Sequence, residues 1–185
     1  LENYNLKGVI YTNTMYSFYP SIEVRNLDYT KSKNNFSKFL LELTASKSIP
    51  YEEIFLDNTF GAMDTRPKII PNIIKAIISD KPNPVTNKDA FINLVFISDV
   101  VKRLDASLEN PQNISTSFLN TQSVNINSVY RFLLKYRNNR KPDNGLLEFK
   151  ANSYKNPQPE NYLKGINLTK LTNSLIGELK SYESK

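Results

Sequence analysis

The 185-residue sequence contains no cysteine, no histidine and no tryptophan, and only five glycines. Without cysteine it forms no disulfide and offers no thiol nucleophile. Without histidine it lacks the imidazole base and the usual ligands of zinc and haem, so we expect no metal site. Any proton transfer must use tyrosine, lysine, aspartate or glutamate. The glycines lie too far apart for a glycine-rich phosphate-binding loop, so G-x-G-x-x-G and P-loop motifs are both absent.

Long apolar runs are also missing. The longest, such as residues 94–97, are far too short to cross a bilayer. The first residues lack the basic and apolar regions of a signal peptide. Length and an ordinary composition, 39% hydrophobic and 23% charged, favour one domain with a real core. We therefore expect a cytoplasmic protein with no membrane partner.

The net charge of +6 could indicate a nucleic-acid partner. However, lysine and arginine are scattered among acidic residues, and the densest basic cluster, residues 135–141, lies at the polar end of an expected helix. A solvated face is the better interpretation, so we expect no nucleic-acid partner. A basic nucleic-acid-associated domain remains a weaker alternative, which salt-sensitive DNA binding would favour.

The first sixty residues have the pattern of a βαβ unit. A β-branched and aromatic run at 6–11 predicts a buried strand that stops at Thr12-Asn13-Thr14. After an expected loop at 16–26, apolar residues at helical spacing predict a helix from Asp28, its cap, to about Ser46. Residues 53–56 predict a second strand. Such a unit implies a parallel sheet, whose ligands bind beyond the carboxyl ends of its strands.

The rest of the chain alternates helices and strands. We expect helices at 70–79, from a Ser98-Asp99 cap to about 108, at 128–137 with Asn127 as cap, and at 167–182. Strands are expected at 93–97 and 117–120, and a polar loop at 141–159. The fold class predicted from this pattern is α/β.

The informative motif is the tyrosine–lysine pair at the start of the first long helix. Tyr29 and Lys33 are four residues apart and so share one helix face. A nearby ammonium stabilises phenolate and lowers the pKa of a tyrosine from about 10, which suits an acid–base catalyst. An ordinary helix surface would show the same spacing. The hydroxyl-rich strand end before the motif and Asn58 after it favour a site.

Six segments, in order, resemble the extended short-chain dehydrogenase/reductases, the NAD-dependent epimerase/dehydratase group that acts on nucleotide sugars. Residues 9–16 are similar to a strand followed by the catalytic Ser/Thr segment, and 29–33 match the form Y-x-x-S-K. The other similar segments are 58–61, 68–71 with 81–85, 93–101 and 117–127. The separation of Thr12 and Tyr29 is shorter than in most of the family, and in this the abequose-synthase-like 4-keto-sugar reductases of O-antigen polysaccharide biosynthesis look similar.

The resemblance implies catalytic roles for three residues. Tyr29 would be the general acid–base, and Thr12 would hydrogen-bond the reacting sugar oxygen. Lys33, together with Tyr29, would bind the nicotinamide ribose and lower the pKa of Tyr29. The implied cofactor is NAD or NADP, and the implied activity is reduction, epimerisation or dehydration of a nucleotide-diphosphate sugar. Hydride would move between the nicotinamide and a sugar carbon, typically C4.

The resemblance also implies a substrate site. Asn58 would contact the sugar nucleotide, and Thr14 lies in the same predicted site. The arginine that the family has just before the 93–97 strand falls at Ile92 here. Lys68 and Lys88 are therefore candidates, on charge alone, for binding the substrate diphosphate.

The resemblance covers only the C-terminal part of the family pattern. Roughly the first hundred residues, with the pyrophosphate loop of the Rossmann fold, are expected to be missing. We expect the C-terminal half of a Rossmann-like parallel sheet, from 1–61 with 98–137, and a small substrate-binding region, from 62–97 with 138–185, in one compact unit. The resemblance also implies a homodimer as one partner, since the family often dimerises through two long helices, of which this sequence has the one at 28–46 and lacks its predecessor. A non-catalytic remnant or nucleotide-sugar-binding module is the alternative.

Overall fold

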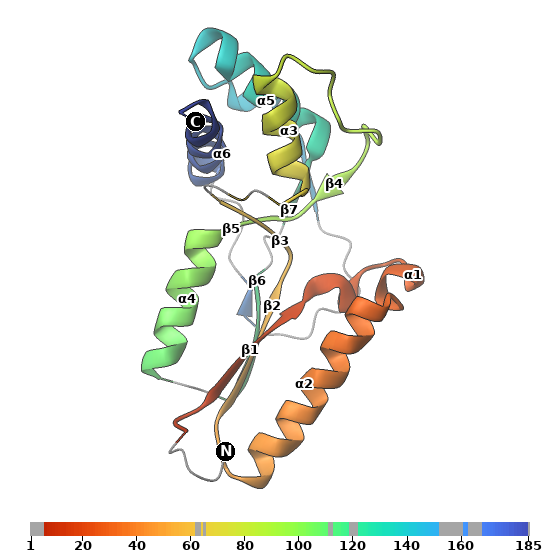
Figure 1. The fold of residues 1–185 in the computed structure, drawn as a ribbon, viewed down its shortest axis with the longest axis vertical. Coiled ribbons are helices and arrows are strands. Elements are labelled where there is room, and N and C mark those ends of the chain that lie inside the picture. Colours follow the sequence, from red (N-terminus) through yellow and green to blue (C-terminus); the bar gives the residue numbers. More distant parts are fainter. Residues whose placement is uncertain are drawn as a thin grey trace. The chain divides into compact units, whose positions relative to one another are not determined.

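The structure, a computed structural model, describes residues 6–61, 64, 66–110, 113–118, 122–151, 161–162 and 168–184 (Figure 1). Its internal contacts divide the chain into two units. Unit 1 contains Leu1–Asp57, Ser98–Leu119 and Ser153–Leu163, and unit 2 contains Asn58–Ile97, Asn120–Asn152 and Lys164–Lys185. The domain division made from the sequence has other bounds and stays a prediction.

Unit 1 is built around a parallel sheet. Its strands are β1 (Val9–Thr14), β2 (Tyr51–Leu56), β6 (Ile114–Phe118) and β9 (Asn161–Tyr162), in the order β1-β2-β6-β9. Its helices are the 3₁₀ helix η1 (Met15–Phe18), α1 (Ile22–Arg25), α2 (Asp28–Ser46) and α4 (Ile97–Glu109). The first residue of α4, Ile97, is counted with unit 2, and the rest of the helix belongs to unit 1. All three strand pairs are parallel, so the predicted βαβ unit and α/β class are confirmed.

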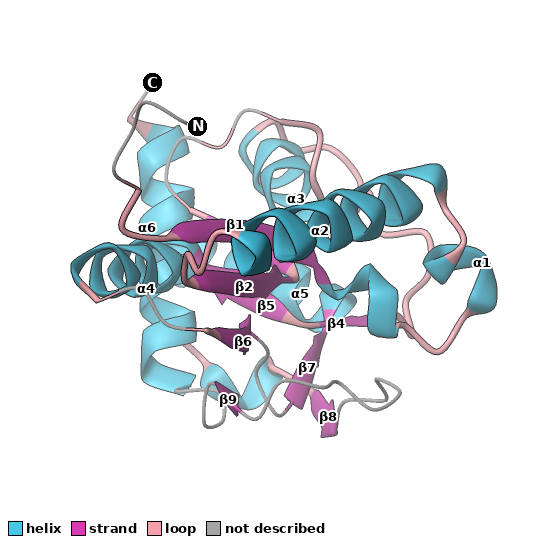
Figure 2. Cartoon of the chain, turned by 90° about the horizontal axis from the view of Figure 1, so that it is seen from below, coloured by secondary structure: helices cyan, strands magenta, loops and turns pink. Residues whose placement is uncertain are grey.

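The helices α2 and α4 cover opposite faces of this sheet. Neighbouring residues of β2 point to opposite faces because side chains alternate along a strand. Glu53 accepts a hydrogen bond from Ser37 of α2, whereas Glu52 pairs with Arg103 of α4. Figure 2 shows α2 lying across β1 and β2. The face that holds α2 is therefore distinct from the face that holds α4.

The pair on the α4 side is a buried charge. Glu52 is fully buried, and one of its carboxylate oxygens, Oε2, has no hydrogen-bond partner among the described residues. A buried carboxylate is costly unless a cation compensates it. Arg103 therefore ties α4 to the centre of the sheet, and removing it would leave an uncompensated charge there.

Several local predictions for unit 1 were wrong. The first strand begins and ends three residues later than predicted, so Thr12-Asn13-Thr14 is half of it. The expected loop at 16–26 contains η1 and α1. The bounds of α2 are those predicted, but its cap position is Leu27, and Asp28 lies in the first turn. There its negative charge interacts favourably with the positive end of the helix dipole, which stabilises α2.

Unit 2 packs three α-helices against short strands. The helices are α3 (Ile69–Ile78), α5 (Ile126–Asn139), α6 (Leu168–Glu183) and the short 3₁₀ helix η2 (Asn144–Leu146). The strands are the parallel pair β3 (Asn58–Phe60) and β5 (Leu94–Phe96), and the antiparallel set β4 (Phe91–Ile92), β7 (Gln122–Asn125) and β8 (Phe149–Ala151). Fully buried side chains at its centre include Ile73, Phe132 and Leu175, one from each long helix. An apolar core thus holds unit 2 together.

Two predictions for unit 2 need correction. Asn125, not Asn127, caps α5, because its side chain accepts the hydrogen bond from the Ser128 amide. Asn127 lies inside the first turn and instead accepts a hydrogen bond from Asn83. The expected loop at 141–159 contains η2 and β8, and its residues 152–160 lie outside the described part. Helices α3 and α6 lie within one residue of their predicted bounds.

Two searches of the described residues found nothing. No helix there combines the length and apolarity that a bilayer crossing needs. No three acidic, histidine or cysteine side chains there come together as a metal-binding group.

Candidate functional site

The carboxyl end of β1 leads directly into a polar turn. Because β1 and β2 are parallel, their carboxyl ends meet at one edge of the sheet, which is where ligands bind in such folds. Thr14, the last residue of β1, is buried, and its hydroxyl accepts a hydrogen bond of 3.2 Å from the Tyr16 amide. This contact caps η1. The structure thus gives Thr14 a local role, and its predicted substrate contact stays a prediction.

Lys33 reaches from α2 to this end of β1. Its ammonium Nζ donates a hydrogen bond of 2.7 Å to the backbone carbonyl of Thr12 and lies 4.8 Å from the ring centre of Tyr11. The Tyr11 hydroxyl in turn donates to the Lys33 carbonyl, at 3.2 Å. Partial burial lowers the pKa of Lys33. The structure therefore brings Lys33 into contact with Thr12, but the contact is to the backbone carbonyl of Thr12 and not to its side-chain hydroxyl.

Tyr29 lies at the amino end of α2, one turn before Lys33. Its side chain is 56% exposed, and its ring meets the ring of Tyr16 edge-on, with centres 6.3 Å apart. Burial, the charge of Asp57 and the neighbouring Tyr29 together raise the pKa of Tyr16. Tyr29 thus presents an accessible phenol beside the strand end. Tyr16, which contacts it, was not among the predicted site residues.

A buried polar network underlies these residues. The Asn13 side-chain amide donates to Glu53 at 2.7 Å and to Asn34 at 3.2 Å. Asn34 also accepts from Ser17 of η1, at 2.9 Å, and Glu53 accepts from Ser37 of α2. Asn13 and Ser37 are buried. The network joins β1, β2, η1 and α2, and its hydrogen bonds fix α2 in rotation against the sheet.

In unit 2, Asn58 and Lys68 lie near each other in sequence and on ordered elements. Asn58 begins β3, where it pairs with Leu94 of β5. Lys68 occupies the cap position of α3, and its ammonium donates to the carbonyl and hydroxyl oxygens of Thr59, at 3.2 and 3.3 Å. Lys68 is thereby bound to Thr59, the residue that follows Asn58, which is another candidate for the substrate site.

Gly61 is required where β3 ends. A Cβ atom built there would lie 2.1 Å from Ile97 Cγ2, far inside any tolerated contact. The segment from Asn58 to Gly61 is therefore shaped by close packing against the end of β5.

A second cation lies beside Lys68. Arg66 forms a two-point contact with Asp64, at 2.7 and 2.8 Å, and its side chain is 65% exposed. Hydrogen bonding by Arg66 is the main cause that lowers the pKa of Asp64 to about 2. Lys68 lies 3.6 Å from the same carboxylate. Sequence reasoning missed Arg66, although its spacing of two from Lys68 was a usable signal.

Lys88, the last candidate, lies in an exposed turn. Its backbone carbonyl accepts a hydrogen bond of 2.8 Å from the Asn125 side chain, the residue that caps α5. Its predicted role in diphosphate binding stays a prediction.

Comparison with known proteins identifies the fold. No protein-family model matches the sequence. No curated protein sequence matches it either. Among solved structures, a UDP-N-acetylglucosamine 4-epimerase from Methanobrevibacter ruminantium is 16% identical, with a TM-score of 0.71 over 99% of this chain and 65% of its own. A UDP-glucuronic acid 4-epimerase from Bacillus cereus, solved with NAD, is 13% identical, with a TM-score of 0.71 over 99% and 63%.

A third match is the dTDP-glucose 4,6-dehydratase of Bacillus anthracis, also solved with NAD, at 13% identity and a TM-score of 0.68 over 96% and 62%. The chain has the fold of the nucleotide-sugar epimerases and dehydratases. The resemblance predicted from the six sequence segments is thereby confirmed at the level of the fold. The chain spans between 62 and 65% of the length of these three structures.

The epimerase-like fold places the predicted residues in both units. In unit 1, Lys33 reaches the Thr12 carbonyl, and Tyr29 lies one helical turn before Lys33 with its ring against Tyr16; Asn58 and Lys68 belong to unit 2. Residues that sequence reasoning missed, such as Asn13 and Glu53, lie beneath the first group. Their signal was weak, because a buried asparagine in a strand resembles an ordinary polar position.

The polar network makes a prediction about alkaline pH. Burial raises the pKa of Tyr51 from 10.0 to about 12, and the charge of Glu53 adds to the rise, while Tyr51 shares a hydrogen bond of 3.0 Å with Ser37. The folded chain thus keeps a proton that the unfolded chain loses near pH 10. The resulting stability is fully present below pH 10 and is lost as the pH rises to about 12.

We therefore expect Tyr51→Phe to make the free energy of unfolding fall less steeply between pH 10 and 12. Urea unfolding at a series of pH values measures this. Tyr130→Phe, in unit 2, is the matched control and should keep the wild-type slope. An unchanged slope in Tyr51→Phe would show that the buried phenol does not titrate as described.

Proposed function

We propose that the chain is the catalytic and substrate-binding part of an NAD(P)-dependent reductase or epimerase of a nucleotide-diphosphate 4-keto sugar. The observation that carries this proposal is the Lys33 ammonium, held on the end of β1 one helical turn from the exposed phenol of Tyr29. Structures of the same fold solved with NAD support it. A location in the cytoplasm and a role in polysaccharide biosynthesis belong to the same proposal.

The groups at the strand end suit a nicotinamide ribose. Among the described residues, Lys33 Nζ donates one hydrogen bond, to the Thr12 carbonyl, which leaves two of its three N–H groups for a ligand. Tyr29 adds a second donor on the same helix face. Both groups suit ribose hydroxyls, so the donor set fits NAD or NADP. When bound, the reduced cofactor would supply the hydride for C4 of the sugar.

Proton transfer falls to Tyr29. As hydride adds to C4, the C4 carbonyl oxygen gains negative charge and takes the proton from the Tyr29 hydroxyl, so the ketone becomes an alcohol. The Thr12 hydroxyl would donate a hydrogen bond to the same oxygen. Lys33 stabilises the phenolate that remains, because a nearby cation favours the charged form of a tyrosine. The reverse sequence oxidises the alcohol.

The unit 2 residues are assigned to the nucleotide sugar. Asn58 begins β3 and carries an amide suited to a sugar or phosphate oxygen. Lys68 and the exposed Arg66 both lie beside Asp64, and as neighbouring cations they are suited to a diphosphate. Lys88 is a further candidate on charge alone. The first match was solved with UDP-N-acetylmuramic acid, which supports a nucleotide-sugar ligand for this fold.

A second candidate function is a nucleotide-sugar-binding module without hydride chemistry. The observation that favours it is the same lysine contact, since a hydrogen bond to the Thr12 carbonyl also suits a purely structural lysine. In that case substrate would bind, but no cofactor would be oxidised.

The catalytic proposal predicts a loss of activity when the hydroxyl oxygen of Tyr29 is removed. In the full-length protein, Tyr29→Phe should lower kcat about 10²- to 10⁴-fold, because the proton donor is lost. Lys33→Met should raise KM for the cofactor and lower kcat as well. NAD(P)H absorbance with a dTDP-4-keto-6-deoxyhexose as substrate measures both. The matched controls are Tyr130→Phe and Lys31→Met, the latter exposed on the same helix. Full activity in Tyr29→Phe would contradict the assignment.

The proposal includes a homodimer through α2. The helix leaves Phe36 and Phe39 half-exposed, and their rings stack with centres 6.1 Å apart. Such an apolar surface favours burial against a second copy. Phe39→Glu should convert a dimer to a monomer in sedimentation analysis, whereas Lys38→Glu, exposed on the same helix, should not. A monomeric wild-type protein would contradict this part of the proposal.

A further inference from the structure

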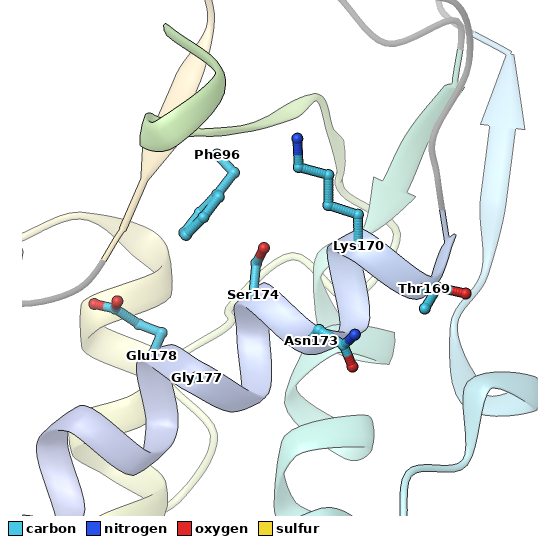
Figure 3. A pocket seen from close by; sticks show the side chains of 7 residues that line it. All are labelled: Phe96, Thr169, Lys170, Asn173, Ser174, Gly177 and Glu178. Atoms are coloured by element: carbon cyan, nitrogen blue, oxygen red, sulfur yellow. The ribbon is translucent and has the colours of Figure 1, made fainter. Parts of the chain in front are cut away.

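Two places outside the predicted site residues gather polar and aromatic side chains. One is a cavity of about 810 Å³ in unit 2, which runs along α6 (Figure 3). Its charged residues Lys170 and Glu178 already interact with other residues of the chain, so their charges do not indicate a ligand. The other place is the 3₁₀ helix η1, which follows β1 and brings Tyr16 to the ring of Tyr29.

The helix η1 is firmly anchored in unit 1. Met15 is fully buried, and the Phe18 ring meets the ring of Phe55 of β2 edge-on, with centres 5.0 Å apart. Ser17 donates a hydrogen bond of 2.9 Å to Asn34 of α2. Three of the four residues of η1 thus attach it to the sheet and to α2, which leaves the fourth as the one that faces the strand end.

That fourth residue, Tyr16, is held through its backbone and its ring. Its amide donates to the Thr14 hydroxyl at 3.2 Å, and its carbonyl accepts from the Tyr19 amide at 3.3 Å. Its ring meets the rings of Tyr19 and Tyr29 edge-on, with centres 5.1 and 6.3 Å away. Aromatic pairs in this arrangement attract each other beyond what burial alone supplies. Tyr16 therefore gives Tyr29 a rigid aromatic surface to rest against.

Tyr29 has few other restraints. Its side chain is 56% exposed, and within the described part of the chain its phenol makes no hydrogen bond and its ring has one aromatic neighbour, Tyr16. An exposed side chain changes rotamer within picoseconds to nanoseconds, whereas a proton donor must stay within hydrogen-bond reach of the oxygen that it protonates. The contact with Tyr16 is the restraint that limits this motion.

Tyr16 is itself poorly suited to give up a proton. Burial is the main cause that raises its pKa, and the charges of Asp57, which follows β2, and of Tyr29 raise it further. A higher pKa makes the Tyr16 phenol a weaker acid, so it stays neutral beside the sheet edge. An effect of Tyr16 on proton transfer would therefore pass through Tyr29.

We propose that Tyr16 is a positioning residue for the proton donor. Held by η1, its ring keeps the Tyr29 phenol in the orientation that proton transfer to the sugar oxygen requires. This inference rests on the proposed function, because it assigns a task to Tyr16 through the reaction of Tyr29. It also explains why η1 is anchored at three points directly after the strand end.

Kinetics of the full-length protein, measured by NAD(P)H absorbance with a dTDP-4-keto-6-deoxyhexose, test the inference. Tyr16→Leu should lower kcat about tenfold, because a displaced donor transfers its proton less often. The cofactor KM should change little, since Lys33 keeps its contact with the Thr12 carbonyl. Tyr16→Phe, which retains the ring, should restore most of the lost rate. Tyr130→Leu, the same change at a half-buried tyrosine of unit 2, is the matched control and should keep kcat.

The decisive comparison places Tyr16→Leu in the Tyr29→Phe background. There it should cause no further loss of rate, because the group that Tyr16 orients is gone. A residue that only stabilises the fold would lower both rates by the same factor. Equal losses in the two backgrounds, an unchanged kcat in Tyr16→Leu or no rescue by Tyr16→Phe would each overturn this inference alone. Full activity in Tyr29→Phe would instead overturn the proposed function, and this inference with it.

A measurement on the wild-type chain decides the matter even where Tyr16→Leu does not fold. NMR spectra should show nuclear Overhauser contacts between the ring protons of Tyr16 and Tyr29, together with a single χ1 rotamer of Tyr29. Averaging of Tyr29 among several rotamers, or the absence of these contacts, would contradict the positioning role.

Discussion

Directional hydrogen bonds, more than apolar packing, hold α2 against the sheet of unit 1. The buried residues of this helix are Thr30, Ser37 and Thr44, all hydroxyl-bearing, whereas its phenylalanines lie half-exposed. Ser37 reaches Glu53, and two residues that follow one another on the helix, Lys33 and Asn34, reach the end of β1. Hydrogen bonds depend on angle, so they permit one rotation of the helix where an apolar seam would tolerate several.

That rotation determines what the strand end can do. With Lys33 on the Thr12 carbonyl, the residue one turn earlier, Tyr29, is left accessible at the edge where parallel sheets bind ligands. The acid–base pair is thus a consequence of how α2 is seated. The same seating leaves Phe36 and Phe39 half-exposed, which links the proposed active site and the proposed dimer to one structural cause.

The sequence was enough to predict the long helices, the first parallel strand pair and the motif. Apolar periodicity identified α2 to the residue, and its position between two strands predicted the parallel pairing of β1 with β2. Periodicity did not reveal which face of α2 is buried, because Phe36 follows the helical pattern yet stays half-exposed at the edge of the sheet, where its ring meets that of Tyr11. The predicted bounds of β1 were three residues too early, because the polar residues Thr12-Asn13-Thr14 look like the end of a strand. Their pairing with β2 shows that they belong to the strand.

Features that depend on distant residues could not be predicted. Glu53 lies 40 residues from Asn13, and no local pattern marks their contact. Arg103 and Glu52 are 51 residues apart, and each alone resembles a surface charge. Local preference thus predicts elements, whereas tertiary contacts decide registers and sites.

The central claim is that Lys33 and Tyr29 bind a nicotinamide ribose, and a titration with nicotinamide mononucleotide tests it most directly. This probe carries only the half of the cofactor that the chain is proposed to hold. NMR spectra of the full chain should show saturable shifts at the Tyr29 ring and the Lys33 side chain, which Lys33→Met abolishes and Lys31→Met preserves. Shifts confined to other residues, or none at saturating probe, would contradict the account.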